Sequence, residues 1–222
     1  MAMRVEPTAA WGDAEGRRRD ILLAATALLD AGGYGALTMR AIAERAGMSA
    51  GTIYQYYAGK ESVFSALVVR RMEAMRRAIE GTARSNGLAP VLRAVVPEAV
   101  ELWRSIGRTA ALWEGDLLGT GRTQVGLSAS PGSRPWRAML GALRAALEEA
   151  AGQEGLVLRE DPSLVPYVWG SLMGLADDLV HGWSQTAGLD SNDLIAFTIE
   201  AVARGIVDEP RERPSRRGGD GA

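Results

Sequence analysis

The sequence predicts an all-α protein in which an N-terminal three-helix domain with a helix-turn-helix precedes a C-terminal helical domain. Apolar residues recur at three- and four-residue spacing along most of the 222-residue chain, as in helices with one buried face. Segments that alternate apolar and polar residues, as strands do, are nearly absent. At this length about 70% of the surface of the unfolded chain can be buried. We expect four parts: a disordered arm over 1–16, a helix-turn-helix domain over 17–64, a helical domain over 65–207 and a disordered tail over 208–222.

The composition excludes several kinds of functional site. The chain has 0 cysteines and 1 histidine, which removes disulfide frameworks, thiolate zinc sites, cysteine nucleophiles and sites with several histidines. We therefore expect no metal site and no cofactor. No run of about 18 apolar residues occurs, and the N-terminus lacks the apolar core of a signal peptide. These features predict a cytoplasmic protein without a membrane partner.

The charge is unevenly distributed along the chain. The formal net charge is -2, from 25 basic and 27 acidic residues. Residues 1–80 hold 11 basic and 9 acidic residues, whereas residues 81–222 hold 14 and 18. The N-terminal part is therefore slightly basic, and the rest of the chain is more acidic. For binding to nucleic acid, a local excess of basic residues matters more than the net charge of the whole chain.

Helix start and stop signals divide the N-terminal part into three helices. The first is predicted from Arg17 to the Gly32-Gly33 pair, which ends it. Thr38 is placed to cap a second helix over 39–46, ended by a left-handed Gly47, and Ser49 caps a third over 50–57. Two short helices joined by three residues that include a glycine form a helix-turn-helix.

Residues 21–64 (ILLAATALLDAGGYGALTMRAIAERAGMSAGTIYQYYAGKESVF) resemble the DNA-binding domain of the TetR (tetracycline-repressor-like) family. The resemblance is carried by Ala24-Ala25, Gly33-Tyr34, Thr38, Ile42-Ala43, Ala46-Gly47, Ser49, Gly51-Thr52, Tyr54, Tyr57 and Lys60-Glu61. The many positions at fixed spacing make it specific, although it covers only the first third of the chain. The resemblance implies a double-stranded DNA partner and a C-terminal domain for ligand binding and dimerisation.

The chemistry of the third helix fits contact with DNA bases. The Thr52 hydroxyl and methyl groups suit thymine, Gln55 can pair with adenine through two hydrogen bonds, and small residues at 50 and 51 permit close approach. By resemblance, the phosphate contacts are Thr38, Tyr54, Tyr56 and Lys60, and the base-side positions are Arg40, Ala50, Thr52 and Gln55. Ser49 and Gly51 complete the predicted DNA-binding set.

Other interpretations of these residues remain open at this point. Arg40 alone would be an ordinary solvated charge, and Tyr54 and Tyr56 could belong to the rim of the core. Lys60 lies in AGKES, but a phosphate-binding loop needs glycine at 54 and serine or threonine at 61, where this chain has Tyr54 and Glu61. The spacing excludes a nucleotide-binding loop.

The C-terminal part is predicted to hold a linker helix over 61–81 and five further helices. Their ranges are 90–107, 108–118, 136–151, 163–186 and 191–207, with a long loop over 119–135. Between 164 and 183 apolar or small residues, including Gly170 and Gly174, occur all round the helix. Such a helix should be buried on every side. A second subunit or a monomeric bundle could cover it, and the resemblance favours a homodimer through the last two helices, reading a pseudo-palindromic operator.

A pocket for a small hydrophobic effector is predicted from the large apolar side chains of this domain. The candidate residues are Trp103, Trp113, Trp136, Met139, Trp169, Met173 and Asp177. Met and Trp at helical spacing are also common in cores. His181, one turn after Asp177, could contact a ligand, the subunit interface or the core. The acidic balance and residues such as Glu98, Glu101, Glu114, Asp177 and Asp178 would tolerate a lipophilic cation.

The function predicted from these observations is a homodimeric transcriptional repressor released from its operator by a small hydrophobic ligand. The resemblance implies that the protein represses transcription, and activation of transcription is the alternative. A DNA-binding regulator without an effector is a second alternative, and a helical enzyme a third. We expect no catalytic residues, because no recognised catalytic constellation occurs and one histidine offers little general-base capacity.

Overall fold

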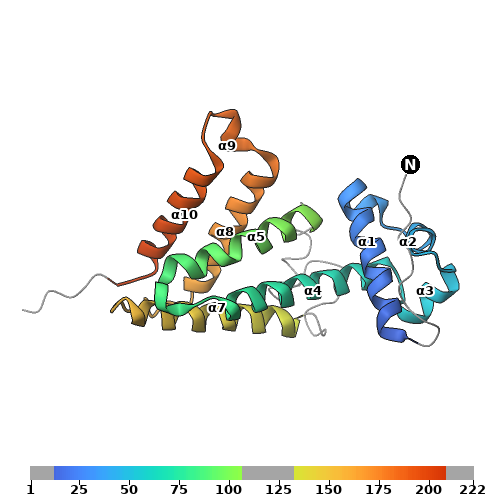
Figure 1. Cartoon of the computed structure of the whole chain (residues 1–222), viewed down its shortest axis with the longest axis horizontal. Helices are drawn as coiled ribbons and strands as arrows, with labels where there is room; N and C mark the ends of the chain where they lie inside the picture. Colours follow the sequence, from blue (N-terminus) through green and yellow to red (C-terminus); the bar gives the residue numbers. More distant parts are fainter. Residues whose placement is uncertain (1–12, 107–132, 209–222) are drawn as a thin grey trace, which may run out of the picture.

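The computed structural model describes residues 13–106 and 133–208, and these residues form helices connected by short turns (Figure 1). The predicted all-α class is confirmed. The only pairing of extended backbone among the described residues is an isolated antiparallel bridge between Leu158 and Val207. The helices are α1 (Ala14–Ala36), α2 (Met39–Ala46), α3 (Ala50–Tyr56), α4 (Lys60–Gly81), the short 3-10 helix η1 (Arg84–Asn86), α5 (Leu88–Ile106), α7 (Ser133–Gln153), α8 (Leu164–His181), α9 (Trp183–Thr186) and α10 (Ser191–Gly205).

The helices form a small head and a larger body that share helix α4. Helices α1, α2 and α3 lie at one end of the molecule, and α4 runs from this head into the body (Figure 1). In the body α4 packs against α5 and α7, while α5 packs against α8 and α10. No helix in the described ranges is long and apolar enough to cross a membrane.

Helix α1 starts earlier than the sequence predicts. The Asp13 side chain accepts a hydrogen bond from the Gly16 N–H at 2.8 Å and caps the helix, so residues 14–16 are helical instead of part of a disordered arm. The predicted stop is confirmed, because Gly32 and Gly33 leave helical geometry and Gly33 has φ of 65°. The rest of the predicted arm, and the tail after residue 208, lie outside the described residues.

The two helices of the helix-turn-helix begin as predicted, and α3 ends one residue before the predicted Tyr57. The Thr38 hydroxyl accepts from the Ala41 N–H at 3.1 Å, and Gly47 ends α2 in the left-handed conformation with φ of 66°. The Ser49 hydroxyl accepts from the Thr52 N–H at 3.0 Å and caps α3. Side-chain caps at both N-termini therefore fix where each short helix starts.

A buried apolar core holds the head together. Ile21, Ile42, Ile53 and Phe64 are all fully buried, and they come from α1, α2, α3 and α4 respectively. The Phe64 ring also meets the edge of Tyr34 at a centroid distance of 4.9 Å. Because each helix contributes to one core, the position of α3 depends on α4 as well as on its own neighbours.

Three predictions for the C-terminal part need correction or lie beyond the description. The helix predicted over 163–186 is broken at Gly182, whose φ of 70° ends α8, and a short α9 follows. The loop predicted to run to Pro135 ends earlier, because α7 begins at Ser133 and a proline is tolerated in a first helical turn. The helix predicted over 108–118 and most of the loop over 119–135 lie outside the described residues.

The composition of α8 predicted burial on every side, but within one chain part of the α8 surface is exposed. One face packs on α5, but Tyr167 is 48% exposed, and Gly170 and Gly174 also lie at the surface. On the neighbouring α10, Phe197 is 71% exposed. The two helices therefore present apolar and small residues to solvent in the single chain.

The two glycines at the end of α1 give a matched test of this backbone. Gly33→Ala should lower the free energy of unfolding by about 1–2 kcal/mol, because its left-handed φ disfavours a side chain although nothing lies within 4 Å of the added carbon. Gly35→Ala should raise it by about 0.5–1 kcal/mol, because Gly35 is helical and equally unobstructed. Urea unfolding of both variants measures the difference. Equal effects at the two positions would contradict the left-handed turn.

Candidate nucleic-acid interface

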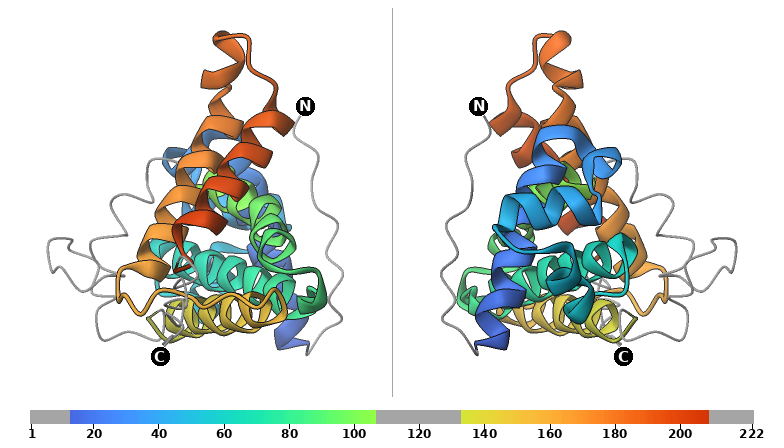
Figure 2. Two further views of the ribbon diagram at one scale, coloured as in Figure 1. Left: turned by 90° about the vertical axis from the view of Figure 1, so that its left-hand side faces the viewer. Right: turned by 90° about the vertical axis from the view of Figure 1, so that its right-hand side faces the viewer.

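The solvent-facing side of α3 carries the residues that the sequence predicted for base contact. Ile53 is fully buried, whereas Ala50, Gly51 and Gln55 are exposed and Tyr54 is 56% exposed. This alternation turns one side of a seven-residue helix to the core and the other to solvent. The right-hand view of Figure 2 looks onto the end of the molecule that α1, α2 and α3 form.

The cap at the start of α3 also fixes the Thr52 side chain. The Thr52 Oγ1 lies 2.8 Å from the Ser49 Oγ, in addition to the backbone hydrogen bond between these residues. The two hydroxyls therefore orient each other, and Thr52 is half-buried. This pair is part of the helix start as well as of the predicted DNA-binding set.

Helix α2 supplies the exposed cation of the predicted set. Arg40 lies in the first turn after the Thr38 cap and is exposed. It forms no ion pair with any other residue that the structure describes. Its guanidinium is thus available beside the exposed side of α3, since α2 and α3 pack against each other.

An aromatic ring lies against Lys60, one of the predicted phosphate contacts. Its Nζ lies 4.5 Å from the centroid of the Tyr34 ring, within the range of a cation-π contact. Burial, and to a smaller extent the charge of Glu61 and its hydrogen bond, raise the pKa of Tyr34. The Tyr34 ring is therefore a neutral platform that positions the ammonium at the start of α4.

Tyr56 contacts a residue that the sequence analysis did not select. The Arg18 guanidinium lies 5.5 Å from the centroid of the Tyr56 ring, and Tyr56 is half-buried. In the sequence, Arg18 belongs to the basic run from Arg17 to Arg19, and such a run on a helix predicts only a solvent-exposed face. Taken together, the predicted DNA-contact residues come from α2, α3 and the start of α4, with Arg18 of α1 beside them.

The predicted effector-pocket residues lie in the body, between α5, α7 and α8. The Trp136 and Trp169 rings meet edge to face at a centroid distance of 4.8 Å, and Met139 and Met173 are buried. Trp113 lies outside the described residues. These side chains are part of the body core, in agreement with the alternative that Met and Trp at helical spacing are core residues.

Asp177 connects two helices through one carboxylate oxygen. Its Oδ1 accepts a hydrogen bond from Trp103 Nε1 at 2.7 Å and lies 2.8 Å from His181 Nδ1. The His181 ring also stacks on Trp183, with centroids 5.7 Å apart. The hydrogen bond from Trp103 to Asp177 thus joins α5 to α8, and His181 lies against the same carboxylate at the end of α8. Within the described ranges no group of three metal-ligating side chains occurs.

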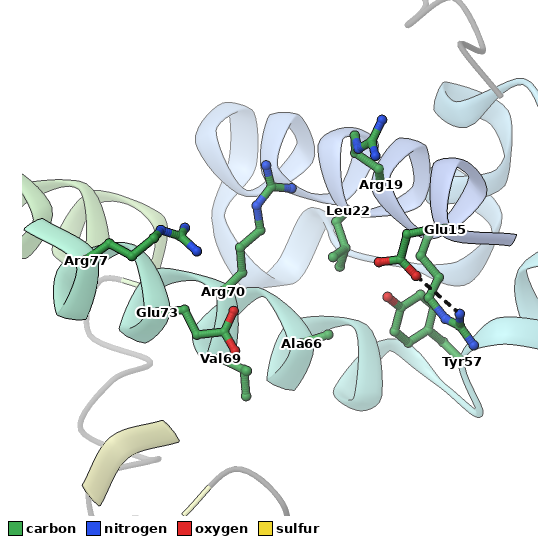
Figure 3. A pocket seen from close by; sticks show the side chains of 10 residues that line it. Glu15, Arg19, Leu22, Tyr57, Ala66, Val69, Arg70, Glu73 and Arg77 are labelled. Atoms are coloured by element: carbon green, nitrogen blue, oxygen red, sulfur yellow. Dashed lines mark ion pairs between the residues drawn. The ribbon is translucent and has the colours of Figure 1, made fainter. Parts of the chain in front are cut away.

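A hollow of about 340 Å³ between α1 and α4 was not predicted from the sequence. Figure 3 shows it from close by, with side chains from both helices along it. It is lined by Glu15, Arg18, Arg19, Leu22, Tyr57, Ala66, Val69, Arg70, Glu73 and Arg77. Each arginine is unremarkable in sequence, and only the crossing of α1 and α4 brings the four together.

Comparison with known proteins identifies the head. Residues 21–67 match the family described as bacterial regulatory proteins, tetR family. The chain is 44% identical over 57 residues to the HTH-type transcriptional repressor KstR of Rhodococcus jostii (strain RHA1), covering 26% of this chain and 27% of that protein. It is 37% identical over 71 residues to KstR of Mycolicibacterium smegmatis (strain ATCC 700084 / mc(2)155), covering 32% and 35%. These matches span about a third or less of the relatives' length.

Comparison with solved structures extends the likeness to the body. A transcriptional regulator from Rhodococcus sp. Rha1 superimposes with a TM-score of 0.61 at 16% identity, over 87% of this chain and 99% of that one. The TetR-like transcriptional regulator LfrR from Mycobacterium smegmatis, solved in complex with proflavine, gives 0.58 at 20% identity, over 89% and 100%. At such identities the likeness establishes the fold. Residues 21–67 thus match the tetR family of bacterial regulatory proteins, and the solved structures show the same fold over nearly the whole chain.

Proposed function

We propose that this protein is a homodimeric transcriptional repressor that binds a pseudo-palindromic operator and leaves it when a small hydrophobic ligand binds the body. The observation that carries the proposal is the exposed side of α3, held by the Ser49 cap and by Ile53 in the core. Both KstR relatives are named as transcriptional repressors, and they match 57 and 71 residues of this chain. This support favours repression over activation.

In this proposal α3 lies in the major groove of the operator. Gln55 and Arg40 have the donors and acceptors to read adenine and guanine, respectively. Ala50 and Gly51 keep the helix surface flat enough for close approach, and the Thr52 methyl group can contact thymine. Around this base-reading surface, Thr38, Tyr54, Tyr56 and Lys60 contact phosphates and set the register.

Two variants separate base reading from phosphate contact. Gln55→Ala should weaken the binding free energy for the preferred operator by about 1–3 kcal/mol, because a base contact is removed. It should also relax the preference for one base at one position of the operator. Lys60→Gln should weaken binding to all sequences and reduce the dependence of log affinity on log salt by about 1, because one phosphate contact is lost. Selection from random duplex DNA, followed by gel shifts at several salt concentrations, measures both.

Gln153→Ala is the matched control, since Gln153 is exposed at the end of α7 in the body. It should leave operator affinity and sequence preference unchanged. If the wild-type protein enriches no sequence from the random pool, the proposed function is wrong.

The proposed dimer forms through the exposed faces of α8 and α10. Tyr167 and Phe197 are large and exposed there, and Gly170 and Gly174 allow a close helix contact. Two heads related by a two-fold axis would then reach half-sites about one helical turn, or a multiple of it, apart. An isolated monomer would hold only half of the phosphate and base contacts.

Phe197→Arg tests this interface. The charge should prevent close packing of the two copies, so sedimentation velocity should show a monomer and operator affinity should fall by at least 10-fold. Val157→Arg is the control, because Val157 is 67% exposed on the connection between α7 and α8 and should leave the dimer intact. A wild-type monomer at micromolar concentration, or a dimeric Phe197→Arg protein, would contradict the proposed interface.

The proposed effector enters the body beside Trp103, Trp136, Trp169, Met139 and Met173. The neighbour LfrR was solved with proflavine, a planar cation, which supports a hydrophobic and cationic ligand here. Several acidic groups already have structural partners, however. Glu101 pairs with Arg71 and with Arg104, and Asp178 accepts from the Ser184 N–H and hydroxyl. Asp177 likewise has Trp103 and His181 as partners, so Glu98 remains as the described carboxylate of this set that could face a cation.

Proflavine and neutral acridine form a matched pair of probes for the effector. Proflavine should raise the unfolding temperature of the DNA-free protein and quench its tryptophan fluorescence, because a bound ligand stabilises the folded state. The absence of DNA is essential, since planar dyes also intercalate. Binding of acridine but not of proflavine would support a hydrophobic effector and contradict a cationic one. If no hydrophobic compound in a broader library shifts the unfolding temperature, the regulator works without an effector.

A further inference from the structure

The hollow between α1 and α4 has the composition of an anion-binding site. Four of its ten lining residues are arginines, Arg18 and Arg19 from α1 and Arg70 and Arg77 from α4. In the view of Figure 3, Arg70 lies between Arg19 and Arg77 along the hollow. The arginines thus come from the two helices that join the head to the rest of the molecule.

The positive charge of the hollow is only partly balanced. Glu15 forms an ion pair with Arg18 at 3.7 Å, and Glu73 is the other carboxylate in the lining. Arg19, Arg70 and Arg77 form no ion pair with any residue in the part of the chain that the structure describes. Four cations face two anions, so the hollow has an excess of two positive charges on a chain whose formal net charge is -2.

The other lining residues give the hollow an apolar floor and a hydrogen-bond donor. Leu22, Ala66 and Val69 are half-buried between the helices. Burial, the largest effect, raises the pKa of Tyr57, while Arg18 acts in the opposite direction. The Tyr57 hydroxyl therefore keeps its proton at neutral pH and can donate to an anion.

The two α4 arginines are too far from the DNA-reading end to extend its phosphate contacts. At 1.5 Å of rise per residue, Arg70 and Arg77 lie about 15 and 25 Å along α4 from Lys60. Helix α4 runs away from α3 over this distance (Figure 1). An anion bound to these arginines would thus come from a separate molecule instead of the operator backbone.

We propose that the hollow binds a small molecule with two or more linked phosphate groups, and that this molecule bridges α1 and α4. Guanidinium groups form paired hydrogen bonds with phosphate oxygens. Arg70 and Arg77 are seven residues apart, about 10 Å along the helix, so linked phosphates use the arginines better than a single phosphate does.

The regulatory consequence rests on the proposed function. A polyanion in the hollow reverses the positive excess of the hollow, which weakens the attraction of this end of the molecule to DNA. Salt screens charges over a Debye length of about 10 Å at 0.1 M, so we expect a modest effect, about 5-fold in operator affinity. A bound bridge also holds the head in one orientation relative to α4.

Isothermal titration of the full chain without DNA or Mg²⁺, at matched ionic strength, tests the site. Pyrophosphate and ATP should bind in a saturable manner and more tightly than orthophosphate, while adenosine should not bind. The Arg19→Gln/Arg70→Gln double variant should bind pyrophosphate at least 10-fold more weakly, because charge-assisted hydrogen bonds are lost. Arg93→Gln/Arg134→Gln has the same change in charge at two exposed arginines outside the hollow, and should bind like the wild type.

Each alternative result overturns the proposal. Equal weakening by both double variants means a general charge effect, and no saturable pyrophosphate binding means no site. If Arg19→Gln/Arg70→Gln loses 10-fold or more of its operator affinity without any phosphate compound, these arginines contact DNA instead. Because the titration contains no DNA, a failure of the protein to bind any operator would leave the result on the site intact.

Discussion

The structure depends on helix α4 belonging to two cores at once. Near its start, Val63 and Phe64 are fully buried with the residues of the helix-turn-helix, and further along Met75 and Ile79 are fully buried in the body. The same helix therefore joins the two parts without a flexible linker. Any change in the body that tilts α4 must also move the packing of Phe64, and with it the head.

Helix α4 passes the proposed DNA-binding surface, the arginine-lined hollow and two of the helices around the proposed effector pocket. Its first residue, Lys60, lies on the Tyr34 ring beside the proposed DNA-binding surface. Its middle faces α1 across the arginine-lined hollow, and its last turns pack against α5 and α7. A ligand in the body and an anion in the hollow would thus bias the same element, which is the physical requirement for coupling between sites.

The sequence predicted best those features that are fixed by neighbouring residues. The caps Thr38 and Ser49 and the left-handed Gly47 act within one helical turn, so their chemistry can be read from a few adjacent letters. The early start of α1 was missed because Asp13 follows a segment that looks unstructured in composition. The break at Gly182 was missed because apolar and helix-forming residues continue on both sides of this glycine.

The features that the sequence could not predict arise where distant helices meet. The contact of Lys60 with Tyr34, the ring of Tyr56 against Arg18 and the Asp177 bridge to Trp103 each join residues from different helices. The hollow likewise depends on the crossing of α1 and α4, because each of its arginines alone has the pattern of a solvated surface charge. Such contacts depend on how helices cross, and no local spacing encodes that angle.

The rigidity of α4 also sets the scale of motion that the protein needs. A straight helix of 22 residues is about 33 Å long. When its body end is held, a tilt of about 10° moves the other end by about 6 Å, nearly two base-pair steps of DNA. Helix α4 thus has the geometry of a lever, because a tilt set by the packing around Met75 and Ile79 becomes a displacement of several ångströms at the head.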